Sequence, residues 1–373
     1  MTEVGPQLPD ALATATEHQP RARVALAAAL AKGPTHAYLL RGPRGCGKRS
    51  AARAFAAEIL AAGAPEPVEA RRRALLDPSP HPDLVWLAPR GAQHLVEEVR
   101  ERVIRASAFR PFEGDSRVFV IADAEAMRDE SQNALLKTLE EPPPFVHLLL
   151  VSSEPEALLE TVVSRCQPVD FAPLPAPVVE SILAREAGAE EAAAAARLAA
   201  GDLDRASFLL TESGRAIREQ AIGCVGAALD GDSDSAPWGR LLEGAETVGE
   251  EAARVCRAAL EAEAEAGVRR SPREIGDEAK RVGRRRRTEA LDLGLELCAA
   301  WIRDLAAIAS GAPDVVFNRD RLPELERRAA ALDLTQARRG VELVQDTRRR
   351  LELNVSEELA LEALVYRLER LLA

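Results

Sequence analysis

Two kinds of hydrophobic pattern alternate along the first 170 residues. Continuous apolar runs at 117–123 and 146–153 are typical of strands that are buried on both faces of a sheet. Similar runs at 36–40 and 83–88 predict two further strands. Stretches with helical spacing separate these runs, so the region predicts an α/β domain with a parallel sheet.

The pattern changes after a proline-bearing segment at residues 171–179. The remainder of the chain has almost no strand signal. Apolar residues recur there at i, i+3, i+4 and i+7, for example at 291–309 and 351–372, which predicts amphipathic helices that bury one face. We therefore predict an α/β domain over 1–170, a small helical domain over 171–213 and an all-helical domain over 214–373.

Composition narrows the class of protein. The chain is 47% hydrophobic and 3% aromatic, and its net charge is -11 at pH 7. This acidic balance argues against a protein that wraps nucleic acid by bulk charge, although it leaves room for a local basic patch. No apolar run approaches the roughly 20 residues of a membrane span, and the N-terminus lacks the pattern of a secretion signal. We expect a soluble cytoplasmic protein.

One strongly basic run interrupts this acidic chain. Residues 280–287 read KRVGRRRR. Runs of this kind are more often solvated than engaged with a ligand. We interpret this one as a solvated helix start or loop, with a contact to DNA or to a partner as the alternative.

The cysteines indicate neither a metal site nor a disulfide framework. The chain has five, none of them in a C-x-x-C pair: Cys46, Cys166, Cys224, Cys256 and Cys298. A closed structural zinc site needs clustered thiolate or histidine ligands. We therefore predict that the chain binds no zinc.

A glycine-rich loop follows the first predicted strand. Its sequence, GPRGCGK, places Gly42, Gly45, Gly47 and Lys48 as in the phosphate-binding pattern G-x-x-x-x-G-K-[ST]. Its position between a strand and a helix favours a loop whose N–H groups and lysine hold phosphates at a helix N-terminus. The alternative is a glycine turn that only allows the strand and the helix to pack.

The position after the lysine departs from this pattern. Arg49 stands where a Ser or Thr hydroxyl would hold Mg²⁺. A guanidinium cannot ligate a cation, and its charge repels one. Ser50 lies one residue further, about 100° around the helix, and is a poor substitute. We infer that the loop keeps a phosphate-shaped backbone and has lost its metal, and the sequence leaves open whether nucleotide still binds.

Three segments carry a resemblance to a known family. HPDLVWL at 81–87, NALLKTLEEPP at 133–143 and VVSRCQPVDF at 162–171 follow one another at characteristic distances. In this order they resemble the bacterial clamp-loader branch of the AAA+ ATPases, whose members are subunits of DNA polymerase III holoenzyme. The resemblance is strong up to about residue 170 and weaker in the helical remainder. It implies an AAA+ domain, a helical lid and a helical collar.

The resemblance also assigns the acids of the expected site. Counted back from Asn133 without gaps, the family's Mg²⁺-binding Asp falls on Ala122 and its catalytic Glu falls on Asp123. With Arg49, three elements of the hydrolytic site are altered. The resemblance therefore implies a stator-like member that does not hydrolyse ATP. The family's four-cysteine zinc module is also missing, because residues 63–80 contain no cysteine.

Four further positions match functional residues of the family. Arg165, in the motif SRC, corresponds to an arginine finger that enters a neighbouring subunit's ATP site. The alternative for Arg165 is an arginine that caps strand and helix ends. Ser152 and Ser153 match the first sensor and Arg205 resembles the second, but without a metal site the serines could equally be plain hydrogen-bonding residues.

The resemblance implies partners as well as a fold. These would be the γ/τ and delta subunits, the sliding clamp and primed DNA, with ATP and Mg²⁺ bound by the neighbouring subunits. The chain alone would not be catalytic, and nucleotidyl transfer would belong to other subunits of the polymerase. A γ/τ-type ATPase and a small-molecule P-loop kinase remain as alternatives. The first would require a hydroxyl after Lys48 or an Asp-Glu pair at 122–123, and the second would require an arginine-rich lid and a catalytic base.

Overall fold

The computed structural model describes residues 8–89, 91, 93–185, 187–265, 271–329, 333–351, 353 and 355–372. The chain divides into two compact units, residues 1–174 and 175–373. The division lies inside the proline-bearing segment 171–179. The predicted small helical domain (171–213) and all-helical domain (214–373) both fall in this second unit, except for residues 171–174. The division into two units does not separate them, so a lid distinct from a collar stays a prediction.

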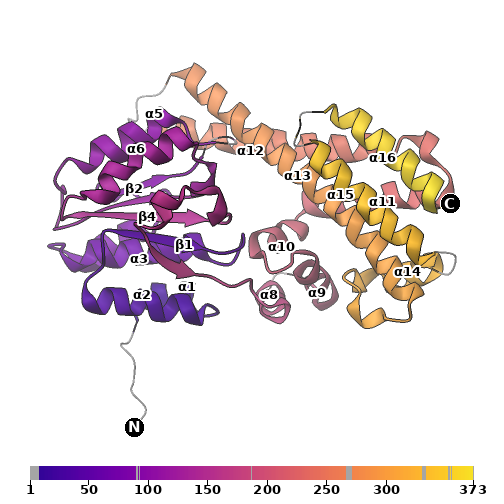
Figure 1. The fold of residues 1–373 in the computed structure, drawn as a ribbon, viewed down its shortest axis with the longest axis horizontal. Coiled ribbons are helices and arrows are strands. Elements are labelled where there is room, and N and C mark those ends of the chain that lie inside the picture. Colours follow the sequence, from indigo (N-terminus) through magenta and orange to yellow (C-terminus); the bar gives the residue numbers. More distant parts are fainter. Residues whose placement is uncertain are drawn as a thin grey trace, which may run out of the picture. The chain divides into compact units, whose positions relative to one another are not determined.

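A parallel sheet forms the centre of the first unit (Figure 1). In the described part of the chain it has five strands in the order β2-β3-β4-β1-β5. The strands are β1 (Ala37–Arg41), β2 (Leu84–Leu87), β3 (Arg117–Ile121), β4 (Val146–Ser152) and β5 (Gln167–Asp170). The parallel α/β prediction is confirmed.

The sequence pattern predicts four of these strands and misses β5. Only Val169 of β5 is buried, so no continuous apolar run marks it. Its second residue, Pro168, has no N–H group for a sheet ladder. At the edge of the sheet β5 pairs with β1 alone, so the missing donor costs no second ladder.

Helices cover both faces of the sheet (Figure 1). The helices of this unit are α1 (Asp10–Ala15), α2 (Pro20–Lys32), α3 (Lys48–Ala62), α4 (Pro67–Leu75), α5 (Val96–Val99), α6 (Asp129–Glu140) and α7 (Glu160–Val163). The 3₁₀ turns are η2 (Ala124–Ala126) and η3 (Pro155–Ala157), and η1 (Arg100–Arg105) is a π-helical continuation of α5. The first helical residue of α6 is Asp129, and Arg128 precedes it as the N-cap.

The core of this unit follows from the alternation of side chains along the strands. On one face, Leu39 and Phe119 pack in a cluster with Leu135 of α6. On the other face, Tyr38 meets Phe55 of α3 edge to face, with ring centroids 5.0 Å apart. Because both faces are covered, the strands are apolar at nearly every position, which is why they read as continuous runs.

The described residues of the second unit form helices joined by turns and contain no strand. Its longer helices are α8 (Ala176–Leu183), α9 (Ala189–Leu198), α10 (Leu203–Leu209), α11 (Glu212–Asp230), α12 (Trp238–Glu265), α13 (Pro272–Ala309), α14 (Leu322–Ala329), α15 (Leu334–Leu351) and α16 (Glu357–Leu372). Short 3₁₀ turns are η4 (Ser233–Ser235), η5 (Pro313–Val315) and η6 (Arg319–Arg321). This confirms the prediction of a helical remainder.

The basic run 280–287 lies inside α13 and is neither a helix start nor a loop. The helix begins earlier, at a capping box in which Ser271 and Glu274 satisfy each other's backbone N–H groups. The run is partly neutralised by carboxylates. Arg286 donates to Glu289 at 2.9 Å, and Arg287 pairs with Glu246 and Glu357 on other helices.

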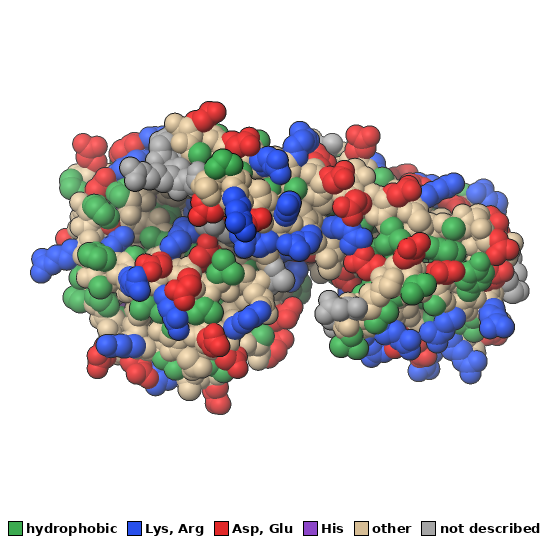
Figure 2. All heavy atoms as spheres, turned by 90° about the horizontal axis from the view of Figure 1, so that it is seen from above, with side chains coloured by type: hydrophobic (Ala, Val, Ile, Leu, Met, Phe, Trp, Pro, Cys, Tyr) green, Lys and Arg blue, Asp and Glu red, His purple; other side chains and the backbone are tan. Residues whose placement is uncertain are grey.

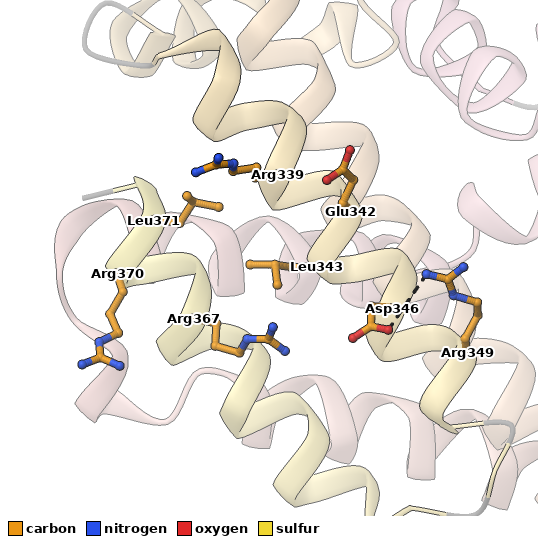
Figure 3. A pocket seen from close by; sticks show the side chains of 8 residues that line it. All are labelled: Arg339, Glu342, Leu343, Asp346, Arg349, Arg367, Arg370 and Leu371. Carbon is orange, nitrogen blue, oxygen red and sulfur yellow. Dashed lines mark ion pairs between the residues drawn. The ribbon is translucent and has the colours of Figure 1, made fainter.

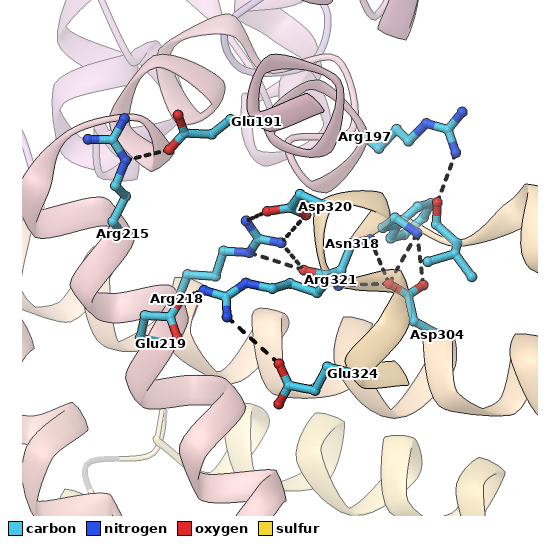
Figure 4. Close-up of polar contacts among 12 residues, drawn as sticks. Glu191, Arg197, Arg215, Arg218, Glu219, Asp304, Asn318, Asp320, Arg321 and Glu324 are labelled. Atoms are coloured by element: carbon cyan, nitrogen blue, oxygen red, sulfur yellow. Dashed lines mark hydrogen bonds and ion pairs between the residues drawn. The ribbon is translucent and has the colours of Figure 1, made fainter. Parts of the chain in front are cut away.

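A buried polar network fixes the segment after α13 (Figure 4). Asp304 is fully buried and accepts hydrogen bonds from the backbone N–H groups of Phe317 and Asn318 at 2.9 and 2.8 Å. Burial raises the pKa of the Asp304 carboxyl, while these donors oppose the shift. Arg218 of α11 donates to both carboxylate oxygens of Asp320 at 2.7 Å and to Asn318 Oδ1.

Candidate nucleotide site

The carboxyl ends of three neighbouring strands carry the predicted site residues. The glycine loop 42–48 follows β1, Ala122 and Asp123 follow β3, and Ser152 and Ser153 end β4. Since the strands are parallel and β4 lies between β1 and β3, these residues meet at one edge of the sheet. Open α/β sheets bind ligands at this edge.

The glycine loop has a backbone that excludes larger residues. Gly42 has φ 147°, and a Cβ atom there would lie 2.2 Å from the carbonyl oxygen of Phe171. Gly47 has φ 93° and is the N-cap of α3. Among the described residues, the backbone N–H groups of Gly45 and Gly47 donate to no acceptor. Free N–H groups at a helix N-terminus suit a phosphate.

Lys48 begins α3, and its side chain turns back over the loop. Its Nζ donates to the carbonyl oxygens of Gly42, at 2.7 Å, and of Pro43, and to Ser153 Oγ at 3.2 Å. Burial lowers the pKa of this ammonium group. The loop's own carbonyls therefore hold the lysine, and a phosphate would compete with them for its charge.

Two of the altered positions lie against each other. Arg49 Nη2 donates to Asp123 Oδ1 at 2.7 Å. The side chain of Arg49 is 53% exposed and that of Asp123 is 18% exposed. Asp123 has a left-handed backbone with φ 49°, which is uncommon for a residue other than glycine. The guanidinium thus engages the carboxylate at the position where the resemblance implies a catalytic acid.

The third altered position is apolar and sealed. Ala122 is fully buried, and its N–H group donates to the carbonyl of Leu87 at 2.8 Å. Its own carbonyl accepts a hydrogen bond from His94 Nε2 at 2.9 Å. Burial lowers the pKa of His94, which favours the neutral imidazole. Position 122 therefore offers a methyl group and an engaged backbone in place of a carboxylate.

These residues fit a phosphate and do not fit Mg²⁺. Mg²⁺ requires a near-octahedral set of oxygen ligands at about 2.1 Å, usually including one or two carboxylates. At the positions where the resemblance implies metal ligands, the side chains of Arg49 and Ala122 offer no oxygen, and Asp123 is held by Arg49. No group of three or more His, Cys, Asp or Glu side chains that could hold a metal occurs in the described ranges.

The structure separates the two predicted sensor serines. Ser153 contacts Lys48, and its backbone N–H donates to Glu125 Oε1 at 3.2 Å. Ser152 is buried and accepts a hydrogen bond from the N–H of Glu154, so its hydroxyl serves the local turn. Glu125 is a site residue that the sequence reasoning missed, although it stands two positions after Asp123 in the same segment.

Gln19 is a second residue that was missed. Its side-chain amide donates to the carbonyl oxygens of Cys46 and Ala172 at 3.1 and 2.8 Å and accepts from the N–H of Ala172. It thus ties the glycine loop to the end of the sheet. No local pattern could reveal this role, because the partners lie 27 and 153 residues away.

Arg165 lies apart from the glycine loop's contacts, just after α7. Its Nη2 pairs with Glu140 at the end of α6 at 2.7 Å, and its Nη1 donates to the carbonyl of Thr161 at 2.8 Å. The side chain remains 35% exposed. Next to it, burial raises the pKa of the Cys166 thiol to about 12, so this cysteine stays a neutral packing residue.

Two further predicted residues have other surroundings. Arg205 belongs to the second unit, where it forms an ion pair with Glu296 of α13. Ser50 is exposed on the first turn of α3.

No helix within the described residues is both long and apolar enough to cross a membrane.

A family model described as "DNA polymerase III, delta subunit" matches residues 18–175. DNA polymerase III subunit delta' of Pseudomonas aeruginosa is 41% identical over 141 residues, which are 35% of this chain and 41% of that protein. Subunit gamma/tau of Mycobacterium bovis is 36% identical over 40% of this chain and 26% of that protein. A gamma subunit-related protein of Thermotoga maritima aligns with 95% of this chain and 100% of its own, with a TM-score of 0.42 and 14% identity. The chain spans less than half the length of the curated relatives.

Proposed function

We propose that this chain works as the delta-prime subunit of the DNA polymerase III clamp loader, because residues 18–175 are similar to delta and delta' subunits of that polymerase. In this role it hydrolyses no ATP. It acts in DNA replication as a stator that positions its neighbours while they use ATP to open the sliding clamp and load it on primed DNA.

The observation that carries the proposal is the ion pair between Arg49 and Asp123 beside the methyl group of Ala122. Similarity alone does not separate the two kinds of subunit, because the matched region is related to both delta' and gamma/tau proteins. A hydrolysing subunit must neutralise charge on the transferring phosphoryl group with a metal. The metal ligands here are replaced, which favours the non-hydrolysing member.

The same contact weighs against the two other functions. A γ/τ-type ATPase would need Asp123 free to act on water and a hydroxyl at position 49. A small-molecule kinase would need Mg²⁺ at the loop as well, because phosphoryl transfer relies on it in both classes.

Arg165 is the residue by which this chain would act on a neighbour. A guanidinium is always charged and offers a planar pair of donors to phosphate oxygens. Arg165 is partly exposed, and among the described residues it is bound to one partly exposed glutamate and to local oxygens. Those contacts are weak enough in water for another anion to replace them. We therefore assign Arg165 as a finger that acts in trans on the ATP of a γ/τ subunit.

The first test asks whether the chain joins the assembly and lacks turnover of its own. Mixed with the γ/τ and delta subunits of its own organism, it should co-elute with them on size exclusion. Alone, it should hydrolyse ATP no faster than its Lys48→Ala variant. Mg²⁺-dependent turnover that requires Lys48 would instead identify a γ/τ-type subunit, and failure to co-elute would remove the clamp-loader assignment.

The second test concerns Arg165 in the reconstituted complex. Arg165→Ala should leave assembly intact, because loss of a surface arginine typically costs within about 0.5 kcal/mol. Clamp- and DNA-stimulated ATPase should fall in part, since the other interfaces of the assembly keep their own fingers. Arg165→Lys should restore little, because an ammonium group cannot make the two-pronged contact.

The matched control is Arg100→Ala, which also breaks an exposed arginine–glutamate pair of the first unit. It should leave the ATPase of the complex unchanged. If Arg165→Ala complexes load clamps at the unmodified rate, the action in trans is wrong and the chain is only a spacer.

A further inference from the structure

A groove lies between α15 and α16 at the C-terminal end of the second unit (Figure 3). Its volume is about 540 Å³. The lining residues come from these two helices only: Arg339, Glu342, Leu343, Asp346, Arg349, Arg367, Arg370 and Leu371. None of them belongs to the nucleotide site or to the proposed finger.

The unpaired charge of this groove is positive. Glu342 is paired with Arg338 at 3.2 Å, and Asp346 is paired with Arg350 at 2.9 Å, so arginines of their own helix neutralise both acids. Three other arginines stand in contrast. Within the described ranges, no ion pair or hydrogen bond engages the side chains of Arg339, Arg367 and Arg370. Basic side chains also gather along one edge of this unit in Figure 2, although the whole chain carries a net charge of -11.

The floor of the groove is apolar. Leu343 and Leu371 are half-buried and lie between Arg339 and Arg367 (Figure 3). A ligand that fills the groove must therefore offer apolar surface at its centre and negative charge at its margins. Arginines favour carboxylate and phosphate partners because their fork of donors matches both.

The length of the groove selects an extended ligand. Arg339 and Arg349 are ten residues apart on α15, which corresponds to about 15 Å at ~1.5 Å per residue. Arg349 is itself paired with Asp346 at 3.9 Å, so this distance measures the lining and not a spread of free charge. The lining extends over nearly three turns of α15, and a small metabolite would cover only part of it. An amphipathic helix can present one apolar stripe and flanking carboxylates over the same length.

We propose that the groove between α15 and α16 docks an acidic amphipathic helix of a partner protein. Its leucine-like side chains pack on Leu343 and Leu371, and its carboxylates pair with Arg339, Arg367 and Arg370. A nucleic-acid backbone fits less well, because phosphates would leave the two leucines uncovered and the lining contains no aromatic side chain for stacking. This inference does not depend on the proposed function.

The probe is a fluorescent helical peptide of about 14 residues, which is ~21 Å long. It consists of Glu with leucines spaced alternately three and four residues apart, so that they form one stripe. Binding to the full chain is followed by fluorescence anisotropy. Three comparison probes are a twin with Lys in place of Glu, a peptide of the same composition without the leucine stripe, and a single-stranded DNA of similar length. The acidic amphipathic peptide should bind best, and raising salt from about 50 to 500 mM should weaken it.

The decisive variant is Arg339→Glu/Arg367→Glu, which reverses two unpaired charges. It should weaken the acidic peptide at least tenfold. The matched control, Arg254→Glu/Arg257→Glu, makes the same change of charge on exposed positions of α12 and should stay within about twofold of the parent chain. Circular dichroism and a melting curve establish that both variants are folded. Leu343→Ala, which keeps every charge, should weaken the peptide by a smaller factor.

Four results would overturn the inference. The first two are the absence of saturable binding of the acidic peptide below about 1 mM, and equal binding by the lysine twin or by the peptide without the leucine stripe. The other two are unchanged binding of the acidic peptide to the groove variant, and DNA binding that is tighter than peptide binding and is lost in the groove variant. The last result would make the groove a nucleic-acid site instead.

Discussion

The Arg49–Asp123 ion pair of the first unit and the Arg218–Asp320 ion pair of the second differ in how far they are exposed to solvent. Arg49 touches Asp123 through one nitrogen and is 53% exposed. Arg218 holds both oxygens of Asp320, donates to Asn318 as well, and is 10% exposed. The distance is 2.7 Å in both pairs, so distance alone does not distinguish them.

The difference teaches that the environment decides what an ion pair does. Exposed pairs contribute about 0.2–1 kcal/mol, because water and salt screen them. Breaking a buried pair costs about 3–5 kcal/mol, because the remaining charge is left without a partner. The pair in the second unit is therefore structural. The pair in the first unit adds little stability, and its consequence is chemical, because it engages the carboxylate of the nucleotide site.

The largest expected effect is in the second unit. Arg218→Ala should lower the free energy of unfolding of this unit by about 3–5 kcal/mol, because Asp320 and Asn318 lose their shared donor in a largely buried place. Urea unfolding followed by circular dichroism measures the change. Arg254→Ala, which breaks an exposed pair of α12, is the control and should shift it by no more than about 0.5 kcal/mol. Equal losses of unfolding free energy in Arg218→Ala and Arg254→Ala would show that burial does not distinguish these ion pairs.

An intermediate effect is expected when metal ligands are restored to the first unit. In Arg49→Thr/Ala122→Asp, the new carboxyl group is buried, so without a cation it should stay protonated and destabilise the unit by about 1–3 kcal/mol. Mg²⁺ with ATP should then raise the melting temperature, because ligands stabilise the state that binds them. Arg49→Thr alone should show no Mg²⁺-dependent shift. A shift in that single variant would show that the acid at 122 is dispensable.

The smallest effect is expected for the exposed pair itself. Arg49→Ala should change the free energy of unfolding by less than about 1 kcal/mol, because the arginine is half in water. The same urea titration as for Arg218→Ala gives the comparison directly. A loss as large as that of Arg218→Ala would mean that the nucleotide site is a structural centre.

Much of the first unit is visible in the sequence, because its signals are local. The runs at 117–123 and 146–153 are apolar at nearly every position, since helices cover both faces of the sheet. The glycine loop is recognisable because its positive φ angles fall on glycines, such as Gly42 and Gly47. The sequence pattern does not reveal β5, because Val169 is the only buried residue of this strand. The basic run 280–287 is misread as a helix start or loop, because the sequence does not show that α13 begins at Pro272.

The residues alone thus determined four strands of the sheet, the glycine loop and the arginine after its lysine, and the resemblance singled out positions 122 and 123. Only the tertiary structure decided that Arg49 reaches Asp123, that Ser153 and Glu125 join Lys48 at one edge, and that Gln19 ties down the loop. These contacts join residues far apart in the chain, at distances that depend on strand order and packing. A local pattern reports which face of an element is buried, and it carries no information on which distant side chain completes a charge.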